Sequence, residues 1–186
     1  MMKSIVISGP PAVGKTTVAM ALAERFGMRH VSGGDVLKEI AARNGAPRGG
    51  DDWWDRPEGM AFLERRMGDD RFDREVDGRL AEIFEAGGAV ITSYTLPWLV
   101  SDGTKIWLAG SHASSARRMR ARDSMGHDEA LAVTRRRYES NVELYRRLYG
   151  IEFGRDLSVF DSVIETDSLG AGEVIEAAVR AVEGRA

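Results

Sequence analysis

The sequence predicts a three-layer α/β domain, in which helices cover both faces of a five-stranded parallel sheet. Short apolar runs alternate with segments of helical periodicity along the whole chain, and this order is typical of parallel sheets. The length of 186 residues suits one domain with a sizeable core, and the chain contains neither an internal repeat nor a low-complexity linker.

The first expected strand is residues 5–7, a continuous apolar run of the kind that is buried on both faces. Residues 9–16 follow directly and fit the phosphate-loop pattern G-x-x-x-x-G-K-[ST] at each fixed position. Apolar residues then recur at helical spacing over 18–26. A chance glycine-rich turn would not need this strand and helix, so the order favours nucleotide binding.

The residue types of this loop suit a triphosphate. Gly9 and Gly14 carry no side chain that would keep backbone N–H groups from pointing inward, and the helix N-terminus favours anions. Lys15 is expected to reach the β- and γ-phosphates, Thr16 to ligate Mg²⁺ through its hydroxyl, and Thr17 to lie near the α-phosphate. The residues expected to bind ATP are Gly9, Pro10, Pro11, Ala12, Val13, Gly14, Lys15, Thr16 and Thr17.

The second expected strand is residues 28–31, and a helix is expected to start near Asp35. Asp35 has two interpretations that stay open: a helix-capping acid, or a carboxylate near the phosphoryl groups that orients Mg²⁺ waters or an acceptor hydroxyl. Residues 45–60 are rich in Gly, Pro and Asp and are expected to form a loop. Its paired tryptophans, Trp53 and Trp54, either stack on a planar ligand or seal a small satellite core.

Residues 60–86 are expected to form one or two helices. Asp73 and Asp77 lie four residues apart and therefore share a helical face, where the two carboxylates repel each other unless something binds them. A solvated helix face is the commoner explanation for such a pair. The third expected strand, 88–92, is followed by the segment 93–98 at its carboxyl end, where α/β proteins bind their ligands.

The fourth expected strand is residues 105–109, and two arginine-rich helical segments follow it on either side of the turn 126–128. Local acids balance these arginines poorly, so a helical hairpin that closes over phosphates is favoured over a solvated charged face. A fifth strand at 161–166 and a C-terminal helix complete the expected fold. The arginines of the hairpin are Arg117, Arg118, Arg120, Arg122, Arg135, Arg136, Arg137, Arg146 and Arg147.

The composition excludes several classes of protein. The net charge of −3 does not favour a broad nucleic-acid surface, and the absence of cysteine excludes disulfides and thiolate metal sites. No apolar stretch is long enough to span a membrane, and the N-terminus has no signal-peptide pattern, so a cytoplasmic location is expected. The expected partner is a small-molecule phosphate acceptor, bound by a monomer or a weak dimer.

The sequence resembles the nucleoside monophosphate kinases, most closely the archaeal-type cytidylate kinases. Residues 9–17 match the phosphate loop of that family, residues 31–38 the segment that opens its acceptor site, and residues 73–79 the acidic helix of its acceptor region. Residues 118–123 resemble the helix that enters its lid. Arg137, residues 149–151 and residues 156–161 resemble the lid exit and the run into the last strand. The resemblance extends over most of the chain.

This resemblance implies a P-loop kinase fold with a core of residues 1–34, 88–112 and 156–186, a helical acceptor-binding region at 35–87 and a helical lid at 113–155. It also implies phosphoryl transfer from ATP to CMP or dCMP with Mg²⁺. The residues that it implies in catalysis, which would neutralise charge on the transferring group, are Lys15, Arg118, Arg122 and Arg137. The residues expected to bind the acceptor are Ser32, Asp35, Lys38, Trp53, Asp73, Asp77 and Tyr94.

The sequence departs from the family pattern at three places, two on the acceptor side and one in the lid. Lys38 replaces an arginine for the acceptor phosphate, residues 92–97 replace a Gly-Arg type motif, and Leu144 replaces a lid arginine. One alternative is therefore a small-molecule kinase that resembles shikimate or gluconate kinase, with Asp35 as the base for a hydroxyl acceptor. Another is a nucleotide-dependent switch, although a switch does not need the arginines of a lid.

Overall fold

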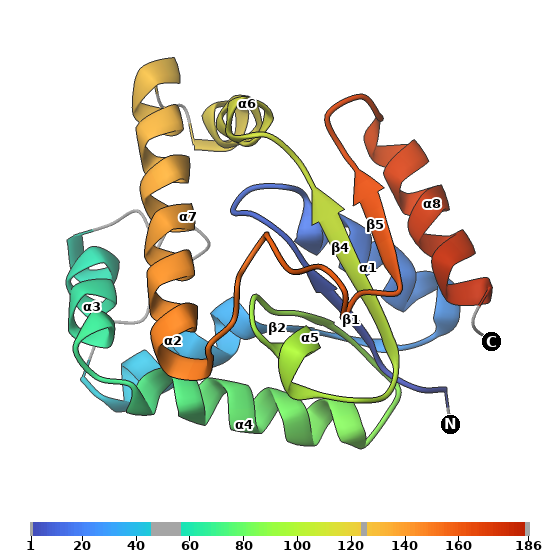
Figure 1. The fold of residues 1–186 in the computed structure, drawn as a ribbon, viewed down its shortest axis with the longest axis horizontal. Coiled ribbons are helices and arrows are strands. Elements are labelled where there is room, and N and C mark those ends of the chain that lie inside the picture. The colour runs from blue at the N-terminus through green and yellow to red at the C-terminus, as the bar shows by residue number, and fades with distance from the viewer. Residues whose placement is uncertain (1, 46–56, 124–125, 185–186) are drawn as a thin grey trace.

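The structure confirms the predicted three-layer α/β fold, with a five-stranded parallel sheet between two layers of helices (Figure 1). The computed structural model describes residues 2–45, 57–123 and 126–184. The strand order is β2-β3-β1-β4-β5, which places β1 at the centre of the sheet. The strands are β1 (Ile5–Ser8), β2 (Arg29–Ser32), β3 (Ala89–Thr92), β4 (Thr104–Ala109) and β5 (Ser162–Glu165).

Strand β1 is buried on both faces, because β3 and β4 flank it and helices cover the sheet above and below. Ile5 pairs with Val90 of β3 and with Thr104 of β4 in parallel register. Ile5, Val6 and Ile7 are fully buried, which explains why this strand has a continuous apolar sequence instead of an alternating one. The carboxyl end of β1 therefore brings the phosphate loop to the middle of one edge of the sheet.

Helices α1 (Lys15–Phe26) and α8 (Ala171–Glu183) pack on one face of the sheet. Leu22 of α1 and Val174 of α8 belong to one buried cluster with side chains of β1, β3, β4 and β5. Because α1 begins directly after Gly14, its N-terminus lies against the phosphate loop. Packing of α1 on this face of the sheet therefore fixes the position of the phosphate loop.

Helices α2 (Gly33–Arg43), α4 (Arg71–Glu85) and α5 (Leu96–Leu99) cover the opposite face. Helix α3 (Pro57–Met67) lies further from the sheet and reaches this layer through Phe62, whose ring contacts Phe72 of α4 (Figure 1). Phe62 of α3 and Leu80 of α4 pack with Val6 and Ile91 of the sheet in a second cluster. The short helix α5 was not predicted, because its four residues are too few to show helical periodicity. Helices α2, α3 and α4 make up most of the described part of region 35–87, whose role in acceptor binding stays a prediction.

Helices α6 (His112–Asp123) and α7 (His127–Tyr149) form the predicted hairpin beyond the carboxyl end of β4 (Figure 1). The first half of α7 packs on α6 through Ala116, Met119 and Ala130. Its second half, with Leu144, Tyr145 and Leu148, joins an aromatic cluster that includes Trp107 of β4 and Phe153. In the described part of the chain, no helix combines the length and the apolar character that crossing a membrane requires.

Candidate active site

The phosphate loop between β1 and α1 has backbone dihedral angles that few residues other than glycine adopt. Gly9, Ala12 and Gly14 have positive φ angles of 148°, 56° and 104°. A Cβ atom on Gly9 would overlap the carbonyl oxygen of Leu108, so only glycine fits at this position. The loop therefore holds its predicted geometry through backbone conformation and close contact with β4.

Lys15 lies in the first turn of α1 and folds back over the loop. Its Nζ donates to the carbonyl oxygens of Gly9 at 2.9 Å and Pro10 at 2.7 Å. Burial lowers the pKa of Lys15; Tyr94 acts against this effect and the charge of Arg137 adds to it. The ammonium group is partly desolvated and its hydrogen-bond acceptors are neutral carbonyls. An anionic ligand would therefore stabilise its positive charge strongly.

Thr16 and Thr17 follow in the first turn of α1, and both are exposed. No acidic side chain lies in this turn, and Gly14 at the N-cap position offers no side chain to the first N–H groups. Unpaired N–H groups at a helix N-terminus attract phosphate. The predicted donor site is thus open to solvent, and no acidic side chain of the first turn of α1 occupies the place of a phosphate.

Tyr94 lies directly against the lysine of the loop. The Nζ of Lys15 is 4.5 Å from the centroid of its ring, and Ser8 at the end of β1 donates to its carbonyl oxygen at 3.0 Å. Burial alone would raise the pKa of the Tyr94 phenol, but the charges of Lys15, Arg137 and Arg66 lower it. The structure therefore brings three predicted site residues, Lys15, Tyr94 and Arg137, into one positively charged region.

Arg118 of α6 lies at a different part of the site. Its Nη2 donates to the carbonyl oxygen of Thr166 at 2.8 Å and to the hydroxyl of Thr166 at 3.3 Å. Its Nη1 is buried and has no hydrogen-bond partner among the described residues. Such a donor is costly to leave unpaired, which suggests a ligand acceptor. Arg122 lies one turn further along α6, and its side chain is outside the described part of the structure.

Ser32, Asp35 and Lys38 are grouped at the start of α2. The Ser32 side chain caps the helix by accepting a bond from the Asp35 N–H at 3.4 Å. Asp35 is thus a first-turn acid, not the cap itself, and it pairs with the Nζ of Lys38 at 3.2 Å. Its side chain is 64% exposed, so the carboxylate remains accessible.

Asp73 and Asp77 are buried, with 4% and 6% of their surface exposed, so the expectation of a solvated helix face was wrong. The physical reason is that each carboxylate has protein partners. Asp73 accepts bonds from Arg66, and Asp77 accepts bonds from the hydroxyls of Thr95 at 2.5 Å and Tyr149 at 2.8 Å. A single sequence reveals the two acids but not the groups that the fold brings to them.

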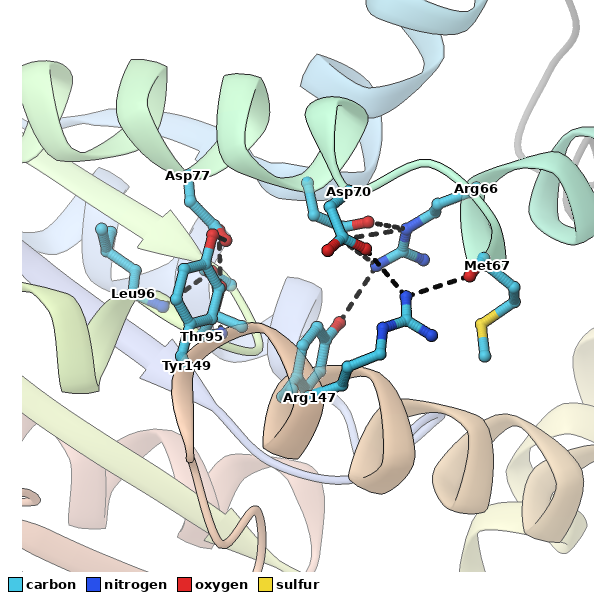
Figure 2. Close-up of polar contacts among 11 residues, drawn as sticks. Arg66, Met67, Asp70, Asp77, Thr95, Leu96, Arg147 and Tyr149 are labelled. Carbon is cyan, nitrogen blue, oxygen red and sulfur yellow. Dashed lines mark hydrogen bonds and ion pairs between the residues drawn. The ribbon is translucent and has the colours of Figure 1, made fainter.

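The second half of α7 is tied to the acceptor-side helices by polar contacts (Figure 2). Arg147 donates to the carbonyl oxygen of Met67 at 3.0 Å and to Asp70 at 2.9 Å. Tyr149 lies at the end of the same helix and donates to Asp77 of α4. The predicted lid and the predicted acceptor-binding region therefore meet at a shared polar interface.

Comparison with known proteins identifies relatives over almost the whole chain. The cytidylate kinase of Halorubrum lacusprofundi is 34% identical over 183 residues, which cover 96% of this chain and 88% of the relative. The chain belongs to the cytidylate kinase family. This confirms the family that the sequence motifs predict, and it makes the protein an ATP-dependent phosphotransferase. A profile described as an AAA domain also matches residues 8–98, which contain the phosphate loop.

Solved structures share the fold of this cytidylate kinase family member. A protein of Eubacterium ventriosum described as uncharacterized aligns with a TM-score of 0.70 and 17% identity, and covers 100% of both chains. A shikimate kinase of Bacteroides thetaiotaomicron aligns with a TM-score of 0.58 and 20% identity, over 100% of this chain and 98% of that one. At these identities the likeness concerns the fold alone.

The site fits the ATP that a cytidylate kinase family member uses. Lys15 is held by neutral carbonyls, the N-terminus of α1 lacks an acidic side chain, and Arg118 has a buried donor without a partner in the described residues. Each of these features leaves positive charge or donor capacity for an anionic ligand. The residues of the predicted donor site are therefore suited to a triphosphate.

Two residues of the site were not singled out from the sequence. Arg66 pairs with Asp73, and Asn141 of α7 acts on Tyr94 by lowering the pKa of its phenol. Asn141 is buried on the same face of α7 as the apolar Leu144 and Leu148, and this polar residue in an apolar stripe was a usable signal. Trp53, predicted to contact the acceptor, and Trp54 lie outside the described residues.

The Asp77→Asn variant is expected to be more stable than the wild type at neutral pH. Burial raises the pKa of Asp77 from 3.8 to about 6, against the opposing effects of the hydrogen bonds from Thr95 and Tyr149; Asp73 raises it further and Arg66 lowers it. A raised folded-state pKa stabilises the fold at low pH, and this contribution is lost as the pH rises through 6. The charged form therefore costs up to about 3 kcal/mol at pH 7.

Urea unfolding between pH 4 and pH 8 tests this prediction. The wild type should lose stability across the window from pH 4 to pH 6, and Asp77→Asn should flatten this part of the profile. Asp102→Asn is the matched control, because the Asp102 side chain is 81% exposed and should not affect the profile. Equal pH dependence in Asp77→Asn and wild type would contradict the assignment.

Proposed function

We propose that this protein transfers the γ-phosphoryl group of ATP to a nucleoside monophosphate, with CMP or dCMP as the best acceptor. The observation that carries the proposal is the cytidylate kinase relationship over 96% of the chain. The positive region around Lys15, Tyr94 and Arg137 supports it, because the reaction brings together two phosphate groups that repel each other. The acceptor would bind in region 35–87, and the hairpin at 113–155 would act as its lid.

The side chains of this site would act through charge and position. Lys15 would hold the β- and γ-phosphates, and Arg137 would stabilise the charge that develops on the transferring group. The acceptor phosphate is already ionised at neutral pH, so its oxygen needs no general base. Arg118, whose Nη1 has no hydrogen-bond partner among the described residues, would bind the phosphates of ATP from the side of Thr166.

Mg²⁺ is part of the proposal, and Thr16 would supply its protein ligand. The Thr16 side chain is exposed in the first turn of α1, next to the lysine of the loop. The described residues contain no group of three or more acidic or histidine side chains that could hold a metal ion. The remaining ligands would therefore be phosphate oxygens and water, as Mg²⁺ prefers. When bound, the ion neutralises charge on the phosphates.

An acceptor panel tests the proposed function. ADP formation should be measured with CMP, dCMP, UMP, AMP and dTMP, and in parallel with shikimate, gluconate and similar hydroxyl acceptors. CMP or dCMP is expected to give the highest kcat/KM. If each monophosphate is inert and a hydroxyl compound is turned over, the proposal is wrong. Asp35, which is accessible near the start of α2, then becomes the candidate base.

A further inference from the structure

A buried guanidinium group lies on the acceptor side of the site. Arg66 belongs to α3, and only 12% of its side chain is exposed. Its Nε donates to both carboxylate oxygens of Asp73, at 3.0 and 2.9 Å, and its Nη2 donates to the hydroxyl of Tyr145 at 3.3 Å. Figure 2 shows Arg66 reaching from α3 into the space between α4 and α7.

A line of contacts connects Arg66 to the phosphate loop. The ring of Tyr145 lies 6.2 Å from the ring of Tyr94, and the Tyr94 ring lies 4.5 Å from the Nζ of Lys15. Arg66 acts on Tyr94 in the same sense as Lys15 and Arg137, since all three charges lower the pKa of its phenol. The positive region thus extends from the loop to the acceptor-side helices.

The ion pair with Asp73 does not by itself explain a guanidinium at this position. Buried ion pairs add little net stability, because desolvation of both charges offsets their attraction. The pair does fix the orientation of Arg66, and it leaves Nη1 without a hydrogen bond to any residue that the structure describes. A guanidinium held in one orientation binds a second anion with little loss of side-chain entropy.

Other candidates for an acceptor phosphate are weaker on this side of the site. Lys38 already pairs with Asp35 at 3.2 Å, and a lysine cannot grip a phosphate with two parallel hydrogen bonds. Residues 92–97 and Leu144 stand where the resemblance leads us to expect arginine, and none of these side chains carries a positive charge. Among the described side chains of α3 and α4, Arg66 is the arginine whose charge reaches Tyr94.

We infer that Arg66 binds the phosphate of the nucleoside monophosphate acceptor, and that Asp73 orients its guanidinium for this contact. The inference rests on the proposed function, because it assigns a residue to the acceptor of that reaction. Lys15 and Arg137 would then face the donor phosphates while Arg66 faces the acceptor phosphate. Asp73 is a positioning residue in this scheme, since it acts through Arg66.

The test compares CMP with cytidine, which differ only in the phosphate. The variants are Arg66→Met, the double variant Arg66→Met/Asp73→Asn, which leaves no unpaired buried carboxylate, and Arg66→Lys, which keeps the charge. Arg65→Met is the matched control, because Arg65 precedes Arg66 on α3 and is exposed. Dissociation constants for CMP and cytidine come from calorimetry, KM values for CMP and ATP from ADP formation, and folding from circular dichroism.

Loss of the guanidinium should weaken CMP binding roughly 10- to 100-fold, the range expected for charge-assisted hydrogen bonds. In the double variant, cytidine binding and the KM for ATP should stay unchanged, and Arg66→Lys should fall between wild type and Arg66→Met. Equal weakening of CMP and cytidine, or identical behaviour of the lysine and methionine variants, overturns the inference while the proposed function stands. A wild type that phosphorylates no monophosphate overturns both.

Discussion

The Lys15→Ala variant is expected to fold normally and to lose about 100- to 1,000-fold in kcat, the range found when one preorganised donor is removed from a charged transition state. Lys15 is the ammonium group nearest the loop carbonyls, and burial already lowers its pKa. The Nζ of Lys15 donates its two hydrogen bonds to backbone carbonyl oxygens of the loop, not to a carboxylate. Replacement by alanine therefore breaks none of the ion pairs among the described residues. The effect should therefore appear in turnover much more than in stability.

Lys3→Ala is the control for this experiment, since the Lys3 side chain is 73% exposed and pairs with Asp102 at 3.4 Å. The rate of ADP formation and the far-ultraviolet circular dichroism spectrum should be measured for both variants and the wild type. Near-normal turnover of Lys15→Ala with an unchanged spectrum would show that the loop lysine is not part of the donor site.

Arg137→Ala is expected to lower kcat by about 100-fold or more, with a smaller change in the KM for ATP. The charge of Arg137 acts on both Lys15 and Tyr94, so this arginine belongs to the positive region around the loop lysine. The charge on the transferring group is greatest in the transition state, and the contribution of Arg137 should be greatest there. Steady-state kinetics with varied ATP and CMP separate the two parameters.

The same helix supplies the controls for Arg137. Arg135 and Arg136 are both exposed on α7, and their replacement by alanine should leave kcat close to that of the wild type. If the three variants behave alike, the arginines act through general charge and not through position. An effect of Arg137→Ala confined to the KM for ATP would assign this residue to ground-state binding instead.

The fold could be predicted because its signals are local. The apolar runs of β1 and β3, the loop pattern after β1 and the helical periodicity of α1 each lie within a few consecutive residues. The short helix α5 lacked such a signal, because its four residues make little more than one turn. Tertiary position, not intrinsic periodicity, decides its conformation.

The sequence indicates the candidate donor-side residues more directly than the acceptor-side residues. Lys15 belongs to a motif whose function depends on spacing along the chain, so the sequence identifies it directly. Asp73 and Asp77 were found as a pair, but their burial depends on partners distant in sequence, such as Tyr149. Arg66 was hidden because Arg65 beside it makes the segment resemble an ordinary charged surface.

The first half of α7 packs on α6 and its second half on the aromatic cluster, so the helix can act as a lever. Its 23 residues span about 34 Å at a rise of roughly 1.5 Å per residue. Its end near Tyr145 is fixed to the aromatic cluster and the acceptor-side helices, while its start near His127 extends toward α6. A tilt of about 10° around Tyr145 would displace His127 by roughly 5 Å but Arg137 by only about 2 Å. Small adjustments where the acceptor-side helices contact α7 are therefore amplified along its length, and Arg137 moves less than the start of the helix.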